Sequence, residues 1–151
     1  MYFEDFERNC TIPIPPAQIE KEEMLNFALK YDNVPLHTDE AYAKTTHFGR
    51  LLTPGFLSFL AVWSRYLEVD KFGQELLAGK SAKIEWFKPV FAGDVLTGRA
   101  VVTNLTQRNE KNGIVEMTIY VYNQHGELVL MNTTEAIVKC RRDKAPDSFP
   151  Q

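Results

Sequence analysis

Apolar side chains between residues 19 and 31 repeat with the period of an α-helix. The positions that share one face, at i, i+3, i+4 and i+7, are Met24, Phe27, Ala28 and Tyr31. A cluster of glutamates precedes them, which suits the positive end of a helix dipole. The pattern predicts an amphipathic helix over residues 19–31. Prolines directly before it, in residues 13–16, exclude a helix there and favour an extended segment at a sheet edge.

Two further helices are predicted by their N-terminal signals. Thr38, followed by two acidic residues, has the composition of a cap and first turn, and opens a short helix through about Lys44. Thr53-Pro54 is a stronger signal, because threonine caps helices well and proline suits the first helical position. It opens a longer helix over residues 55–67, whose apolar residues cover nearly the whole circumference. We therefore expect other elements to enclose this helix.

After Gly79 the hydrophobic period changes to two, which is typical of half-buried β-strands. The alternating runs lie at residues 82–87, 95–108, 114–123 and 128–140. Asn112-Gly113 and Gln124-His125-Gly126 have the composition of turns between antiparallel strands. Helices first and four strands afterwards predict one α+β domain over residues 1–151, in which an antiparallel sheet wraps around one long central helix.

The charge balance limits the partners that the surface can attract. Lysine and arginine number 17 against 20 aspartate and glutamate, a formal net charge of −3, so no basic excess is present to neutralise a nucleic acid. The longest stretch without a charged side chain, residues 51–64, is shorter than the roughly 20 residues that a bilayer span requires. The acidic N-terminus lacks the positive charge of a secretory signal. We expect no membrane partner, a cytoplasmic location, and structural thiols at Cys10 and Cys140.

The strongest candidate chemistry lies where the first two helices meet. Asp32 and His37 would lie about 140° apart on a continuous helix, but Pro35 interrupts it and favours an extended residue before it. Residues 32–37 should then form a loop in which a carboxylate faces an imidazole. Such a pair can hold a water molecule and move its proton by general acid/base catalysis. An aspartate that ends one helix and a histidine that precedes another are also ordinary capping residues, so spacing alone leaves both interpretations open.

The sequence around this pair resembles the hydratase motif of MaoC-like dehydratases and (R)-specific enoyl-CoA hydratases. That motif reads Asp-x-Asn-Pro-(Leu/Ile/Val)-His and is followed by a His-Gly or Ser-Gly pair that opens a long central helix. The matching residues here are Asp32-Asn33-Val34-Pro35-Leu36-His37 and Thr53-Pro54-Gly55. Residues 2–6, 87–94 and 123–127 are similar to further signatures of the family, in the same order along the chain. The resemblance implies a hotdog fold, in which an antiparallel sheet wraps around a long helix.

The resemblance also implies the site residues and the reaction. Asp32 and His37 match the catalytic dyad, and Gly55 matches the glycine whose backbone N–H binds the thioester oxygen. The implied reaction is the reversible hydration of a trans-2-enoyl thioester of coenzyme A to a 3-hydroxyacyl thioester, in fatty acid metabolism. The implied enzyme is a homodimer that uses no metal and no cofactor apart from the coenzyme A thioester as its substrate. Two positions depart from the pattern: Val34 replaces an asparagine, and Trp63 replaces a serine that some hydratases carry on the central helix.

Two other functions stay open at this point. Hotdog proteins include thioesterases, but these often place a carboxylate on the central helix, and residues 55–67 contain no aspartate or glutamate. A non-catalytic acyl-CoA-binding subunit of a hydratase complex is the other alternative, which the departure at Val34 favours. The basic residues that could meet the phosphates of coenzyme A are Arg50, Lys88, Lys139, Arg141, Arg142 and Lys144.

Overall fold

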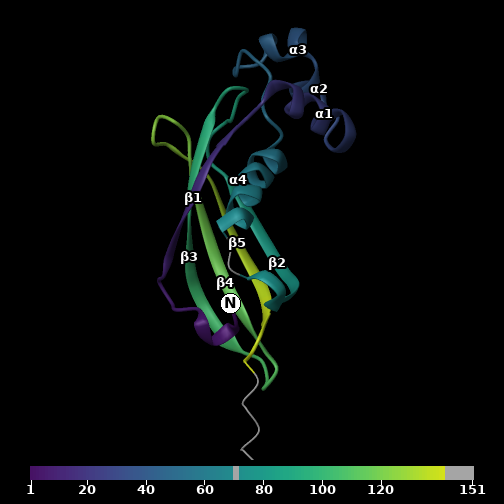
Figure 1. Ribbon diagram of the computed structural model, residues 1–151. Coiled ribbons are helices and arrows are strands. Elements are labelled where there is room, and N and C mark those ends of the chain that lie inside the picture. The colour runs from purple at the N-terminus through teal and green to yellow at the C-terminus, as the bar shows by residue number, and fades with distance from the viewer. Residues whose placement is uncertain (70–71, 142–151) are drawn as a thin grey trace, which may run out of the picture.

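Figure 1 shows a computed structural model of the chain, which describes residues 1–69 and 72–141. The helices are α1 (Lys21–Tyr31), α2 (Pro35–Thr38), α3 (Glu40–Thr45) and α4 (Gly55–Val69), with short 3-10 turns η1 (Phe3–Asp5) and η2 (Gly73–Glu75). The strands are β1 (Thr11–Gln18), β2 (Leu76–Trp86), β3 (Val95–Gln107), β4 (Asn112–Tyr122) and β5 (Leu128–Lys139). None of the helices in these residues is long and apolar enough to cross a bilayer.

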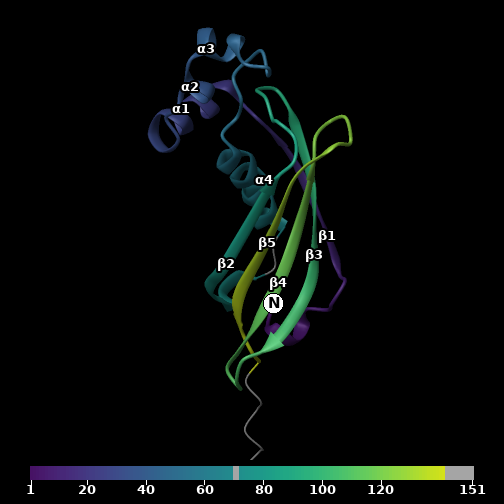
Figure 2. The same cartoon turned by 180° about the vertical axis from the view of Figure 1, so that it is seen from behind.

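The strands form one antiparallel sheet with the order β1-β3-β4-β5-β2. The sheet curves along the length of α4, and α1, α2 and α3 gather near the N-terminal end of α4 (Figures 1 and 2). The predicted α+β architecture, a long helix wrapped by an antiparallel sheet, is therefore confirmed. Each predicted strand is present, although β2 begins at Leu76, earlier than the alternation indicates.

The proline-rich segment near the N-terminus is the edge strand β1. It pairs with β3 alone, and its register shifts between Ile14 and Ala17, where two prolines stand. Proline has no N–H to donate to a neighbouring strand, so it is tolerated at an edge or an irregularity of the ladder. The extended edge segment expected from these prolines is confirmed.

One side of α4 forms part of the core, and the other side is exposed. Val62 is 1% exposed, and it packs so closely on β3 that a Cβ added at Gly98 would lie 3.2 Å from its Cγ1. On the opposite side Phe56 is 56%, Leu60 43% and Leu67 47% exposed. The expectation that other elements enclose the whole helix is wrong for this chain by itself, because the sheet covers only one side.

The predicted N-terminal caps of α3 and α4 are each displaced by one residue, although α4 begins at Gly55 as expected. The side chain of Asp39, and not Thr38, caps α3 by accepting a hydrogen bond from the N–H of Tyr42 at 3.0 Å. The carbonyl of Pro54 accepts the first helical bond of α4, from Ser58 N–H at 3.1 Å, so Pro54 stands at the cap. Thr53 is buried, and its hydroxyl donates to the sulfur of Met24 at 3.0 Å instead of capping the helix.

The turn expected at Asn112-Gly113 lies slightly earlier in the chain. Both residues belong to β4, and the side chain of Asn109 closes the turn by accepting the N–H groups of Lys111 and Asn112 at 2.8 and 3.0 Å. Gly113 serves a different purpose, because a Cβ there would lie 2.5 Å from the ring of Phe3. The glycine is explained by this close approach of an aromatic ring and not by the turn.

Candidate active site

Asp32 directly follows α1, and His37 lies in the next helix, α2, which begins at Pro35. Asp32 follows the last residue of α1, and its N–H donates to the carbonyl of Ala28 at 2.9 Å. Val34 has the extended backbone expected of a residue before proline, with φ −125° and ψ 150°. Pro35 then starts the single helical turn α2, which contains His37. The predicted loop is thus partly wrong, because proline is well suited to a first helical position and allows one turn to form.

The two side chains face each other closely enough to bind the same water molecule from one side. Nε2 of His37 lies 3.5 Å from Oδ2 of Asp32, with side-chain exposures of 10% and 30%. Nδ1 of His37 lies 2.6 Å from the backbone carbonyl of Leu52. A carbonyl oxygen can only accept, so Nδ1 carries the proton of this bond, and Nε2 of the neutral ring has a free lone pair. Asp32 and His37 therefore offer two neighbouring acceptors to one water molecule.

The segment before α4 holds the histidine in place. The N–H of Leu52 donates to the carbonyl of Leu36 at 3.2 Å, and the N–H of Thr53 donates to the carbonyl of Val90 at 2.8 Å. The same segment thus binds the helix turn of His37 on one side and the loop after β2 on the other. As a result, the imidazole is oriented by backbone groups that are themselves fixed.

A pocket of about 320 Å³ brings the three predicted site residues together. Asp32, His37 and Gly55 all line it. Gly55 is the first residue of α4, where N–H groups have no acceptor within the helix and the dipole is positive. The pocket therefore combines a carboxylate and an imidazole with backbone N–H donors at a helix N-terminus.

Two further side chains in this pocket were not predicted to belong to it. Ser58 is 1% exposed and lies one turn after Gly55 on the same side of α4, so the helix period could have indicated it. Trp86 is the last residue of β2, and its indole N–H donates to the carbonyl of Gly55 at 3.0 Å. Trp86 and Gly55 are 31 positions apart in the chain, and no local sequence signal connects them.

The two residues that depart from the family pattern lie in different surroundings. Val34, where the family has an asparagine, is 43% exposed. Trp63 packs against Phe59 and Tyr66, with ring centroids 5.8 and 5.2 Å apart. Among the described residues that line the pocket of Asp32 and His37, Trp63 does not occur.

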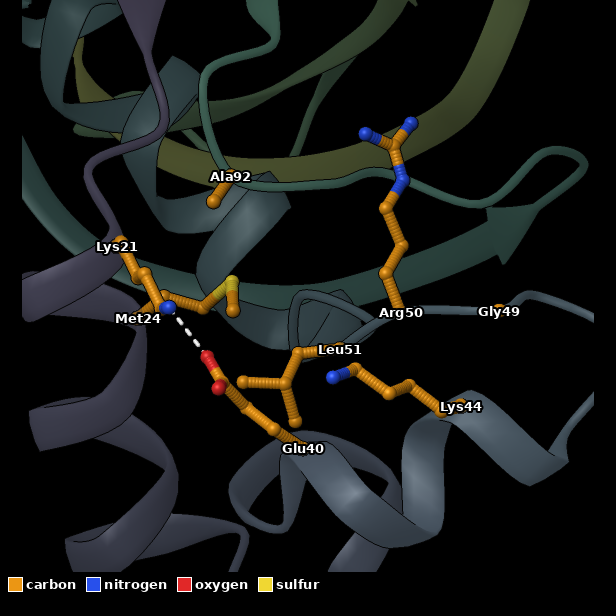
Figure 3. A pocket seen from close by; sticks show the side chains of 8 residues that line it. All are labelled: Lys21, Met24, Glu40, Lys44, Gly49, Arg50, Leu51 and Ala92. Atoms are coloured by element: carbon orange, nitrogen blue, oxygen red, sulfur yellow. Dashed lines mark hydrogen bonds and ion pairs between the residues drawn. The ribbon is translucent and has the colours of Figure 1, made fainter.

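A second pocket, of about 260 Å³, lies beside α1 and α3 (Figure 3). Met24 and Leu51 contribute apolar surface to it, and Lys21 of α1 forms an ion pair with Glu40 of α3. The ammonium of Lys21 lowers the pKa of the Glu40 carboxyl below its usual value. Arg50 points away from this ion pair in Figure 3. Neither Asp32 nor His37 lines this pocket.

Several of the basic residues expected to meet phosphates have partners within the chain. The guanidinium of Arg50 lies 3.8 Å from the centroid of the Phe91 ring. Lys88 pairs with Glu127 at 3.5 Å, and Arg141 pairs with Asp5 at 2.6 Å. Positions 142 and 144 of the predicted set lie outside the described residues.

The two cysteines lie in different environments. Cys140 is buried, and this burial raises the pKa of its thiol, whereas Cys10 is exposed. Both are free thiols.

Within residues 1–69 and 72–141, no three side chains of histidine, cysteine, aspartate or glutamate gather in an arrangement that could hold a metal ion.

Comparison of the sequence with known proteins identifies relatives of this chain. Residues 7–123 match the family model described as a MaoC like domain. The (R)-specific enoyl-CoA hydratase of Aeromonas caviae is 36% identical over 113 residues, which make up 74% of this chain and 78% of that enzyme. The family model's match over residues 7–123 includes Asp32, His37 and Gly55.

Solved structures agree with the sequence comparison. A monoamine oxidase regulatory protein from Archaeoglobus superposes with a TM-score of 0.87 at 30% identity, over 93% of this chain and 95% of that one. The (R)-hydratase of Aeromonas caviae involved in PHA biosynthesis superposes with a TM-score of 0.71 at 29% identity, over 91% of this chain and 99% of that one. The hotdog fold implied by the motif is thereby confirmed, and the chain belongs to the MaoC-like dehydratase family.

Proposed function

We propose that the protein catalyses the reversible hydration of a trans-2-enoyl thioester of coenzyme A to a 3-hydroxyacyl thioester. The observation that carries the proposal is the geometry of Asp32 and His37. They lie 3.5 Å apart, with the far nitrogen of the imidazole bound to a carbonyl, in a pocket that also contains the first residue of α4. The relatives named hydratases support the same class of reaction.

In the proposed mechanism, one water molecule in the pocket hydrogen-bonds to both the carboxylate of Asp32 and Nε2 of His37. The pair accepts a proton from this water as its oxygen bonds to the β carbon of the substrate, and it delivers a proton to the α carbon. The dehydration runs through the same steps in reverse. The reaction adds water without a change in redox state, so acid/base groups and a bound coenzyme A thioester are the only components that the proposal requires.

The N-terminus of α4 supplies the second part of the proposed mechanism. When water adds to a conjugated thioester, negative charge develops on the carbonyl oxygen. The N–H of Gly55 would donate to this oxygen, and the helix dipole would add to the stabilisation. Removal of one such donor in other enzymes lowers kcat by about 10²- to 10³-fold.

A spectroscopic assay tests the proposal. The purified protein is mixed with enoyl-CoA substrates of short, branched and long acyl chains, and the loss of the enoyl-thioester absorbance is followed. We expect turnover of at least one substrate by the natural protein, and a loss of about 10²- to 10⁴-fold in the His37→Ala variant. Full activity of a folded His37→Ala variant would contradict the assignment of the dyad.

Two further measurements distinguish the alternative functions from hydration. A thioesterase would release free coenzyme A, which a thiol reagent detects. Glu68, the carboxylate near the end of α4, is exposed and forms an ion pair with Arg65 at 3.1 Å, which gives it no place in the pocket. A non-catalytic subunit would bind acyl-CoA without turnover until a catalytic partner is added.

The exposed side of α4 supports the further proposal of a homodimer. Phe56, Leu60 and Leu67 form an apolar stripe along the helix, and β2 is an edge strand whose second side is unpaired within the described sheet. A second copy of the chain would cover the stripe and extend the sheet. Light scattering should give twice the mass of the chain, and Leu60→Lys should shift the protein toward the monomer. A natural protein that is monomeric at micromolar concentration would contradict the proposal.

A further inference from the structure

Gly55 is held from outside its own helix by the side chain of Trp86. The indole N–H of Trp86 donates to the carbonyl oxygen of Gly55 at 3.0 Å. This carbonyl belongs to the same peptide plane as the N–H of Phe56, so the bond fixes the direction of that plane. The end of β2 is thereby joined to the first turn of α4.

The contact depends on the absence of a side chain at Gly55. A Cβ at this position would lie 2.6 Å from both Cε2 and Nε1 of Trp86. This distance is shorter than a van der Waals contact, so the ring would have to move. The space beside the Cα of Gly55 is thus filled by the indole. The glycine is required by an aromatic ring of the same chain, whatever its additional value for a substrate.

A neighbouring ring holds the indole in its orientation. Phe56 meets Trp86 edge to face, with centroids 5.5 Å apart and an interplanar angle of 80°. Trp86 and Phe56 also line the pocket that contains Asp32 and His37. The same indole therefore contacts the helix backbone and forms part of the pocket wall.

We propose that Trp86 is a positioning residue, which fixes the first turn of α4 so that its backbone N–H groups point at the thioester oxygen. This proposal rests on the proposed hydratase function. A donor that is already oriented needs no rearrangement when negative charge develops on the oxygen, so its loss affects the transition state more than the bound substrate. The indole N–H thereby contributes to kcat without contact to the reacting atoms.

The first test is the substitution Trp86→Phe, which keeps an aromatic ring and removes the N–H donor. We expect kcat for enoyl-CoA hydration to fall about tenfold, while KM stays within about twofold. Phe87→Leu is the matched control, because Phe87 is the next residue, is 48% exposed and is absent from the lining of the pocket. Unchanged kcat in Trp86→Phe would overturn the proposal, as would an equal loss in Phe87→Leu.

A pair of substitutions distinguishes positioning from simple structural support. In the natural protein, Gly55→Ala should displace the indole and lower kcat at least as much as Trp86→Phe. In a Trp86→Ala background the added methyl group meets no ring, so Gly55→Ala should cause little additional loss. If the glycine matters only for the approach of the substrate, Gly55→Ala will cost the same factor in both backgrounds, and the proposal is overturned.

A measurement without substrate keeps this test separate from the proposed function. In labelled protein, the carbonyl carbon of Gly55 and the amide of Phe56 should change their NMR chemical shifts in Trp86→Phe, and should not do so in Phe87→Leu. Unchanged shifts in Trp86→Phe would overturn the positioning role. Absence of hydration by the natural protein would instead contradict the proposed function, whichever shifts are observed.

Discussion

Two pockets of similar size share the segment between α3 and α4 but differ in their charged pairs. Leu52 and Thr53 line the pocket of Asp32 and His37, whereas Arg50 and Leu51 line the pocket with Lys21 and Glu40. In the first pair the side chains are 10% and 30% exposed, and in the second 57% and 56%. Each pocket thus holds a carboxylate and a nitrogen base, one pair shielded and the other solvated.

The difference shows what makes such a pair suitable for proton transfer. The ammonium of Lys21 has no lone pair near neutral pH, and the lowered pKa of Glu40 keeps that carboxylate ionised. In contrast, the bond from Nδ1 of His37 to Leu52 leaves Nε2 of the neutral ring free to accept a proton. A backbone acceptor bound to one nitrogen of a histidine therefore indicates a group suited to proton transfer better than the mere presence of two ionisable groups does.

The strongest test of this comparison neutralises one carboxylate in each pocket. Asp32→Asn should lower kcat for enoyl-CoA hydration by about 10²- to 10⁴-fold, because the amide cannot accept a proton from water. Glu40→Gln should change kcat less than about twofold, since its carboxylate only pairs with an exposed lysine. Steady-state kinetics on both purified variants provides the measurement. Equal losses in the two variants would remove the distinction between the pockets.

A second substitution tests whether the buried wall of the pocket beside α1 contributes to the stability of the fold. Met24 is 0% exposed and accepts the hydroxyl of Thr53 on its sulfur. Met24→Ala should lower the free energy of unfolding by about 2–5 kcal/mol, measured by urea denaturation, because it removes buried contacts and leaves a cavity. Leu29→Ala is the control on the same helix, where the side chain is 58% exposed and a change within about 0.5 kcal/mol is expected. Similar losses in the two variants would show that burial does not set the cost.

The smallest expected effect concerns the exposed ion pair itself. In Lys21→Ala, the pKa of Glu40 should rise from its lowered value toward the ordinary 4.5, which an NMR titration of its carboxyl carbon measures. A lowered pKa in the folded state means that ionised Glu40 adds stability above pH 4.5, and that this contribution is lost as the pH falls through the folded pKa. The stability difference between natural protein and variant should thus be present at pH 7 and vanish under strong acid. An unchanged titration of Glu40 would show that Lys21 does not set its pKa.

Much of the fold could be predicted from local patterns in the chain. The helical period before Tyr31 and the alternation after Gly79 correctly indicated α1 and the strands that follow α4. The predicted details that are wrong concern positions where groups compete for the same contact or conformation. Thr53 had a side chain suited to a helix cap, but the sulfur of Met24 binds its hydroxyl instead. Pro35 interrupted a helix as expected and then started a new turn.

The candidate site could be predicted in its residues but not in its support. The spacing of Asp32, Pro35 and His37 together with the family motif named the pair, and the resemblance to the family named Gly55. Neither the carbonyl of Leu52 behind His37 nor the indole of Trp86 against Gly55 has a sequence signature. Those contacts join separate segments, and their geometry depends on how the sheet and the helices pack.

The sequence by itself determined the class of fold, the family and the three residues on which the proposed reaction depends. These follow from local periodicity and from a short motif, which act within a few positions along the chain. The tertiary structure decided which nitrogen of His37 is free, which side of α4 is exposed and why position 55 must be glycine. Each of these depends on a group that is distant in the chain and is brought near only when the sheet and the helices pack together.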